Sequence, residues 1–440
     1  MCSCTVSRNR AVLTQEEITR TKELTDAINT WNFSMKSISA RGNADQMDAF
    51  TFVSLVKACA KKKDLSTGSR LHADILRNGL LEKSPYLAST LINMYAKCGQ
   101  LSKAEGVLKT VPTRDVVCWS ALIAGYVQQG HGQEALNCFE SMLREGVSPD
   151  AITFTCILKA CSKMGDIDKG KKIHHEIVRR GLLEKDIVLG TALVDMYAKC
   201  GMLKKAQQVL EDLPFRNIVS WSVLIAGCVQ HGQSHEALNY FERMQSEGLL
   251  PDVVTFVCLL KACGSIGAID KGKQIHDEIA SKGLLATDVM LGTALVDMYA
   301  KCGMLLKAKQ VLEELPFRNV VSWSALISGY VQQGQGHEAL NCFVEMKHNG
   351  ISPDVITFIS ILKACGSTCA IEKGKQIHEE IFSKGLLHKD IMLDNALVDM
   401  YAKFGMLAKA QQVLEELPIR DVVSWNALMA GYVQQEQGYE

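Results

Sequence analysis

The stretch Val116 to Asp150, VVCWSALIAGYVQQGHGQEALNCFESMLREGVSPD, recurs along the 440-residue chain at a fixed spacing. Its tryptophan returns every 102 residues, at Trp119, Trp221, Trp323 and Trp425. The flanking residues return with it, as WSALIAGYVQQG, WSVLIAGCVQHG, WSALISGYVQQG and WNALMAGYVQQE. A long fixed period predicts a repeat architecture, in which one extended solenoid replaces separate globular cores.

The 102-residue period divides into three related repeat units of 35, 36 and 31 residues. We call them the Trp unit, the long unit and the short unit. The Trp units are 116–150, 218–252 and 320–354. The long units are 49–84, 151–186, 253–288 and 355–390, and the short units are 85–115, 187–217, 289–319 and 391–421. Eleven complete motifs therefore fill 49–421, and an incomplete one follows at 422–440.

Apolar residues at helical spacing predict that each repeat unit is a helical hairpin. In the first Trp unit, Gly130 and Gly132 are expected to break the chain between two helices. The two predicted faces are Trp119, Leu122, Ile123 and Tyr126, then Ala135, Leu136, Phe139 and Met142. A hairpin this short cannot bury its face alone, so neighbours must stack. The predicted fold is an all-α, superhelical solenoid of about eleven complete hairpins plus a partial one, with a concave inner surface.

Composition narrows the class of protein further. Hydrophobic residues make up 47% of the chain, which excludes disorder, and 48 basic residues balance 48 acidic ones. No apolar run of about 18 residues occurs, so no membrane-spanning helix is expected. Several of the 16 cysteines recur every 102 residues, which indicates reduced packing residues rather than a disulfide framework.

Residues 1–48 do not follow the repeat. LTDAINTWNFSMKSI can form one amphipathic helix, either a degenerate repeat or the N-terminal cap that a solenoid needs. The first residues, MCSCTVSRNR, are basic and lack acids, which fits a transit segment and equally an ordinary disordered start.

The motifs WSALIAGYVQQGHGQEALNCFESM, TFTCILKACSKMGDIDKGKKIHHEI and ALVDMYAKCGMLKKAQQVLEDLPFRN carry a family resemblance. Over 49–440 the chain resembles the pentatricopeptide repeat proteins, specifically the plant class with alternating standard, long and short repeats. The resemblance implies binding of single-stranded RNA, one base per repeat, with no DNA expected. It implies that the fifth and last residues of each repeat face the base.

The resemblance also implies a code. A last residue Asp accepts the ring N–H of guanine or uracil, whereas Asn donates to adenine or cytosine. A fifth residue Ser or Thr favours purines, and Asn favours pyrimidines. The pairs predict G for Ser89/Asp115, Ser120/Asp150, Ser222/Asp252 and Ser324/Asp354, A for Thr191/Asn217 and Thr293/Asn319, U for Asn395/Asp421, and a weak G for Thr155/Asp186. The long-unit pairs Val53/Ser84, Val257/Asp288 and Ile359/Asp390 lack a polar fifth residue and depart from the code.

An alternative role for the same residues is helix capping, because Asp or Asn before a helix is a common N-cap and Ser or Thr is common in a first turn. The two roles are compatible. One comparison favours recoding: Gly292-Thr293 becomes Asp394-Asn395 in the next short unit, where Asn319 also becomes Asp421. Drift would produce the same change.

Two further rows could contact RNA. The second residue of each unit is usually apolar, and the resemblance implies that such residues sandwich the base; ordinary helix packing is the alternative. This row includes Val117, Val188, Val219 and Val321. Lysines recur on the first helix of the short units and could neutralise phosphates, unless they are merely solvated. They are Lys97, Lys199, Lys301 and Lys403.

Catalytic chemistry is not indicated. Three H-x-E matches, at His174, His276 and His378, resemble the start of a zinc-deaminase signature, but no C-x-x-C exists to complete it. We therefore expect no catalytic residue, metal or cofactor. Members of this repeat class often carry further C-terminal modules ending in a deaminase, which are not found here, because the sequence stops within a Trp unit at YVQQEQGYE.

The predicted function is a sequence-specific RNA-binding protein of an organelle, acting as a recognition factor in RNA editing or other RNA processing. The mitochondrion is expected, with the chloroplast as the alternative. The unpaired last helix predicts either a fragment or a docking site for an editing deaminase or accessory protein. A protein-binding helical scaffold is the alternative function.

Overall fold

The computed structural model of the chain describes residues 49–286 and 288–436, and every regular element in these ranges is a helix. The predicted all-α class is therefore confirmed. The interpretations of residues 1–48 as a transit segment, a helix or a cap lie outside the described residues. The chain divides into two compact parts, residues 1–216 and 217–440, and each is described by itself.

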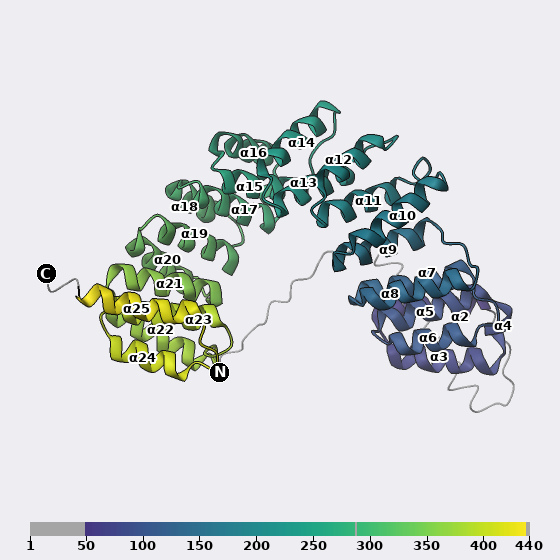
Figure 1. The fold of residues 1–440 in the computed structure, drawn as a ribbon, viewed down its shortest axis with the longest axis horizontal. Coiled ribbons are helices and arrows are strands. Elements are labelled where there is room, and N and C mark those ends of the chain that lie inside the picture. The colour runs from purple at the N-terminus through teal and green to yellow at the C-terminus, as the bar shows by residue number, and fades with distance from the viewer. Residues whose placement is uncertain (1–48, 287, 437–440) are drawn as a thin grey trace, which may run out of the picture. The chain divides into compact units, whose positions relative to one another are not determined.

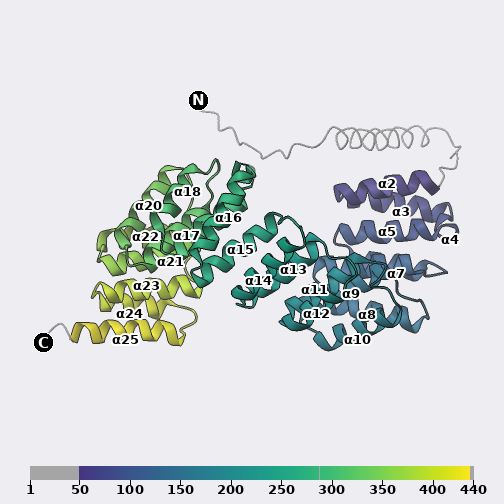
Figure 2. The same cartoon turned by 90° about the horizontal axis from the view of Figure 1, so that it is seen from above.

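The first part is a stack of five helical hairpins (Figure 1, Figure 2). Its helices are α2 (Ala49–Lys62), α3 (Leu65–Arg77), α4 (Leu80–Lys83), α5 (Pro85–Lys97), α6 (Leu101–Thr110), α7 (Val116–Gln129), α8 (Gly132–Arg144), α9 (Ala151–Met164), α10 (Ile167–Arg179), α11 (Ile187–Lys199) and α12 (Leu203–Asp212). The single-turn α4 connects two hairpins.

The second part continues with six hairpins and one further helix, α25 (Val422–Glu436). Its hairpins are formed by α13 (Ile218–Gln230), α14 (Ser234–Ser246), α15 (Val253–Ile266), α16 (Ile269–Ser281), α17 (Val289–Lys301), α18 (Leu305–Glu314), α19 (Val320–Gln332), α20 (Gly336–His348), α21 (Val355–Thr368), α22 (Ile371–Ser383), α23 (Ile391–Lys403) and α24 (Leu407–Glu416), with a 3-10 turn, η1, at Leu284–Ala286. The prediction of eleven hairpins plus a partial one is confirmed for the described residues.

Within each part the helices form two layers. The first helix of a hairpin packs beside the first helix of the next, as α5 does on α2 and α7, and as α17 does on α15 and α19. A second helix packs on its own partner and on the following first helix, as α8 does on α7 and α9. The first helices thus make one continuous surface in each part, and the N-terminal turns of these helices carry the proposed reading positions.

The predicted apolar faces form the core. All eight face residues of the first Trp unit are buried, including Trp119, Leu122 and Met142. Gly130 ends α7 in a left-handed conformation with φ 88°, as expected of a helix-ending glycine. Gly132 was wrongly expected to break the chain, since it begins α8. Its role is close packing, because a Cβ there would meet the Sδ atom of Met164 at 2.6 Å.

The cysteines behave as packing residues. All fourteen cysteines in the described part of the chain are free, and the recurring Cys161 and Cys263 are fully buried. Burial raises the pKa of the Cys161 thiol to about 12, so the residue stays neutral. No helix among the described residues is both long and apolar enough to cross a membrane.

Candidate nucleic-acid interface

The last residues of the repeat units, except Ser84, cap the helices that follow them with their side chains. Asp115 accepts a hydrogen bond from the backbone N–H of Cys118 at 2.9 Å, and Asn319 accepts one from Ser322 at 2.8 Å. The same capping is made by Asp150, Asp186, Asn217, Asp252, Asp288, Asp354, Asp390 and Asp421. The capping role predicted as an alternative is therefore present, and it places each of these carboxylates or amides at the N-terminal edge of a first helix.

In the Trp units the fifth and last residues contact each other, and a threonine of the following long unit hydrogen-bonds to both. The Oγ atom of Ser324 lies 3.3 Å from Oδ1 of Asp354 and 2.5 Å from Oγ1 of Thr357, which itself donates to the same Oδ1 at 2.6 Å. The same arrangement joins Ser120, Asp150 and Thr153, and Ser222, Asp252 and Thr255. Sequence reasoning missed these threonines, although the third residue of the long units recurs as Thr.

These contacts leave one side of each carboxylate open. The serines at position five are buried, 4–6% exposed, and the hydroxyls of Ser222 and Ser324 also bond helix carbonyls. Oδ1 of Asp354 takes the capping and threonine bonds, whereas no hydrogen bond in the described part of the chain is made to its Oδ2. The serine therefore orients the carboxylate of the aspartate rather than offering its own hydroxyl to a base.

Among the three short units whose two positions lie within one part, two bring these positions together. Nδ2 of Asn319 lies 3.5 Å from Oγ1 of Thr293, and Nδ2 of Asn395 donates to both oxygens of Asp421. The hydroxyls of Ser89 and Thr191 instead bond carbonyls of their own helices. Asn217 belongs to the second compact part of the chain and Thr191 to the first.

Asp394, part of the change noted in the last short unit, does not lie at the reading surface. Its side chain is buried and Oδ1 accepts the N–H of His388 at 3.2 Å. Burial raises the pKa of this carboxyl. The recoding comparison therefore rests on Asn395 and Asp421 alone.

A cavity of about 410 Å³ in the second part gathers the proposed reading residues. Met290 and Val321, the second residues of two consecutive units, both line it, together with the pair Thr293 and Asn319. Lys261 also lies on its wall. Two apolar side chains flanking a polar pair is the arrangement that would hold a flat base by its faces and read its edge.

The second-position residues are exposed in every described unit. Val117 is 47% exposed, Val188 63%, Val219 53% and Val321 55%. The equivalent residues of the other units are also exposed: Phe50, Tyr86, Ile152, Val254, Met290, Ile356, Met392 and Val423. Packing within the helices therefore does not account for their apolar character.

The lysines of the short units are mostly neutralised. Lys199, Lys301 and Lys403 each form an ion pair with the Asp four residues earlier, at 2.7–2.8 Å. Lys97 has Asn93 at that place, so it lacks such a carboxylate. As phosphate ligands, the three paired lysines would have to share their charge with an aspartate.

The long units differ at position five. Val53 and Val257 are buried, and Thr155 makes no hydrogen bond to Asp186 in the described part of the chain. Val53 and Val257 offer no polar group to a base, although Val257 lines the cavity described above. This agrees with their departure from the code.

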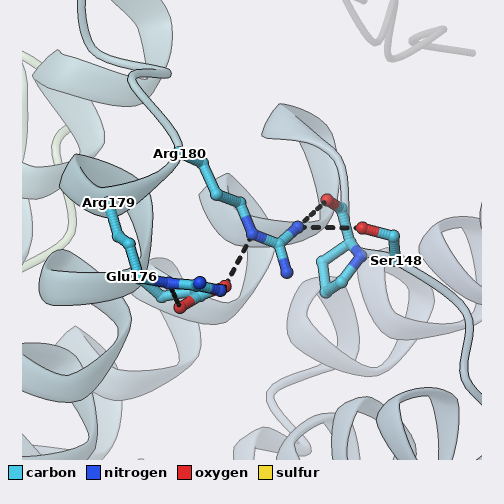
Figure 3. A network of polar contacts seen from close by, with 5 residues as sticks. Ser148, Glu176, Arg179 and Arg180 are labelled. Atoms are coloured by element: carbon cyan, nitrogen blue, oxygen red, sulfur yellow. Dashed lines mark hydrogen bonds and ion pairs between the residues drawn. The ribbon is translucent and has the colours of Figure 1, made fainter.

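Arg180, which directly follows α10 in the second long unit, holds the turn that carries Asp150. Nη1 of Arg180 donates to Oγ of Ser148 and to the carbonyl of Pro149, both at 3.0 Å, while its Nε donates to Glu176 at 2.6 Å (Figure 3). Two arginines, Arg179 first, lower the pKa of Glu176 to about 2. Arg180 thereby holds Pro149, the residue that precedes the capping Asp150, in place.

The histidines of the H-x-E matches have a structural partner. Nδ1 of His174 lies 2.9 Å from the hydroxyl of Tyr197, and His72, His276 and His378 form the same contact with Tyr95, Tyr299 and Tyr401. Burial first, and a nearby lysine second, lower the pKa of each imidazole. No group of three or more His, Cys, Asp or Glu able to hold a metal occurs among the described residues.

The repeating hairpins define the class as an α-helical repeat protein. The PPR repeat family matches residues 114–163, 216–265 and 318–367, and the PPR repeat matches 87–116, 152–182, 191–218, 254–284, 293–320 and 395–422. The chain belongs to the pentatricopeptide repeat family.

Relatives from Arabidopsis thaliana share this family. One pentatricopeptide repeat-containing protein named as chloroplastic is 35% identical over 87% of this chain and 61% of its own length. One named as mitochondrial is 36% identical over 86% of this chain and 37% of its own length. The chain thus spans about half the length of such relatives.

A solved structure shares the fold. The pentatricopeptide repeat protein PPR10, in complex with an 18-nucleotide psaJ RNA element, superposes with a TM-score of 0.70 at 19% identity. The match covers 93% of this chain and 64% of that one.

Proposed function

We propose that this chain is a sequence-specific single-stranded RNA-binding protein of an organelle, and that it is not an enzyme. The observation that supports this most strongly is the cavity in which Met290 and Val321 flank Thr293 and Asn319. Similarity to a protein whose structure was solved with RNA, and to relatives named as chloroplastic or mitochondrial, supports the same proposal.

The proposed mechanism assigns one base to each repeat. Exposed second-position side chains hold the faces of a base, and the last residue reads its ring nitrogen. A carboxylate whose Oδ1 is committed to the helix cap keeps Oδ2 as an acceptor for guanine or uracil, as in Asp354. The alternating standard, long and short repeats support our proposal that the chain is of the plant class that supplies recognition factors for RNA editing, with the mitochondrion as the proposed compartment.

The site proposed from the eleven units, in the 5′ to 3′ direction, is N-G-G-(G)-A-G-N-A-G-N-U. The test is binding of the purified chain to GGGAGUAGUU, compared with AAAGAUGAUU, in which every G and A is exchanged, at one stated salt concentration. A preference of tenfold or more, about 1.4 kcal/mol, is expected. Equal binding would overturn base reading, and no binding would overturn the function.

A further inference from the structure

A second row of lysines, distinct from that of the short units, lies on the first helices of the long units. The ninth residue of each long unit is lysine: Lys57, Lys159, Lys261 and Lys363, at the 102-residue spacing. All four side chains are exposed. Three of these four units depart from the base code and the fourth, 151–186, is assigned only a weak G, so base reading does not account for the row.

The charges of this row are uncompensated among the described residues, although Lys57 donates to the neutral hydroxyl of Tyr86. In the described part of the chain, no carboxylate forms an ion pair with Lys159, Lys261 or Lys363. The short-unit lysines differ, since Lys301 is held by Asp297 at 2.7 Å. The long-unit row is therefore the larger source of net positive charge along these first helices.

Two contacts place the row beside the proposed base cavities. Lys261 lines the same cavity as Met290, Thr293 and Asn319. In the first long unit, Nζ of Lys57 donates to the hydroxyl of Tyr86 at 2.6 Å and lies 5.0 Å from the centre of its ring. Since Met290 and Tyr86 are both second residues of a short unit, the lysine reaches the side chain proposed to flank a base.

The short-unit lysines approach the same strip of surface. A Cβ at Gly264 would lie 3.4 Å from Cδ of Lys301, so the stem of Lys301 runs across α15. Gly264 is three residues after Lys261 and shares its helix face. Gly366 contacts Lys403 in the same way, three residues after Lys363. The boundaries between α15 and α17 and between α21 and α23 thus each present two ammonium groups and one aspartate.

We infer that Lys159, Lys261 and Lys363 bind RNA phosphates. On this inference the long units bind the sugar-phosphate backbone of the RNA, while the Trp and short units recognise its bases. This inference rests on the proposed RNA-binding function. A flanked base leaves its phosphate beside the cavity, where an unpaired ammonium gains most from contact with it. Buried fifth residues such as Val257 are consistent with units that contribute phosphate binding rather than base recognition.

The test compares two triple variants of equal charge. K159Q/K261Q/K363Q removes the proposed phosphate ligands. K171Q/K273Q/K375Q removes three lysines from the second helices α10, α16 and α22 of the same long units, where their side chains are 42–50% exposed. Affinity for GGGAGUAGUU is measured at several salt concentrations, with circular dichroism to verify folding.

For the first variant, the slope of log K against log salt should fall in magnitude by about 2, because each neutralised phosphate contributes about 0.7 to the slope for a single strand. Its preference for GGGAGUAGUU over AAAGAUGAUU should persist. The second variant should keep the original slope. Equal slopes for the two variants would overturn this inference while leaving RNA binding intact, whereas failure of the unmodified chain to bind RNA would overturn the proposed function itself.

Discussion

Asn395 donates from Nδ2 to both carboxylate oxygens of Asp421, at 3.2 and 3.3 Å. The fifth and last positions of this short unit are therefore in direct contact, and Asp421 also caps α25 through the N–H of Ser424. These bonds, that of Ser424 first, lower the pKa of the Asp421 carboxyl, so it remains an anion that only accepts hydrogen bonds. The geometry of this pair and of its counterparts leads to four predictions.

The first prediction concerns recoding of the last short unit. N395T/D421N gives it the pair found at Thr293 and Asn319, whose side chains lie 3.5 Å apart. The preference at the final nucleotide of GGGAGUAGUU should change from U to A, by about tenfold, because the amide offers a donor where the carboxylate offered none. Competition binding with RNAs that differ only at that nucleotide measures this. An unchanged preference would show that residues 395 and 421 do not select the base at this position.

The second prediction separates capping from reading in the Trp units. In D150N/D252N/D354N each new side chain still caps its helix, since Asn and Asp are about equally good N-caps. The free energy of unfolding should change by less than about 0.5 kcal/mol per site. RNA preference should move from GGGAGUAGUU to GAGAAUAAUU. Retained G preference with unchanged stability would leave these residues as caps only.

The third prediction concerns the exposed row at position two. Replacing Val117, Val188, Val219 and Val321 with Ser should leave the melting temperature almost unchanged, because these side chains are about half exposed. RNA affinity should fall by tenfold or more, because the base faces would no longer have apolar side chains against them. Leu122→Ala, in the core, is the contrasting variant and should cost about 2–5 kcal/mol of stability. Equal RNA affinity in the Ser variant would argue against base contact.

The fourth prediction concerns pH. Burial lowers the folded-state pKa of His72, His174, His276 and His378, so below pH about 6.5 the unfolded chain binds more protons than the folded chain. Stability should be fully present above that pH and decrease as the pH falls toward the folded-state pKa values. Chemical denaturation between pH 7.5 and 5 checks this.

A quadruple His→Gln variant at these positions is the control for the pH effect. Its stability should vary less over the same range, because the groups that take up protons on unfolding are gone. If the variant and the unmodified chain lose stability in parallel, carboxylates rather than the His–Tyr pairs cause the effect.

Much of the fold could be predicted because the pattern of apolar residues that defines each helix recurs in several copies of the repeat. The spacing of Trp119, Leu122 and Ile123 marks a buried face, and the structure buries all three. Gly132 was misjudged because a glycine that ends a helix and one that permits close packing look alike in sequence. Only the position of Met164 on the neighbouring hairpin distinguishes them.

The candidate site was predicted less completely, because its contacts join residues far apart in the chain. Thr357 lies 33 residues from Ser324, and nothing in the local sequence indicates that their hydroxyls meet. The ion pair between Lys301 and Asp297 was not predicted, although the four-residue spacing of these two residues on one helix indicates it. The exposure of Val219 likewise required knowledge of which face the stack covers.

The 102-residue period has a consequence for alignment of the ligand. On the proposed assignment, the blocks 116–217 and 218–319 carry the same reading residues in their Trp and short units, so an RNA displaced by three nucleotides would meet nearly the same contacts. The short units at the two ends differ, with Ser89 and Asp115 at one and Asn395 and Asp421 at the other. These two pairs would therefore fix the register, making one alignment of the RNA better than the slipped ones.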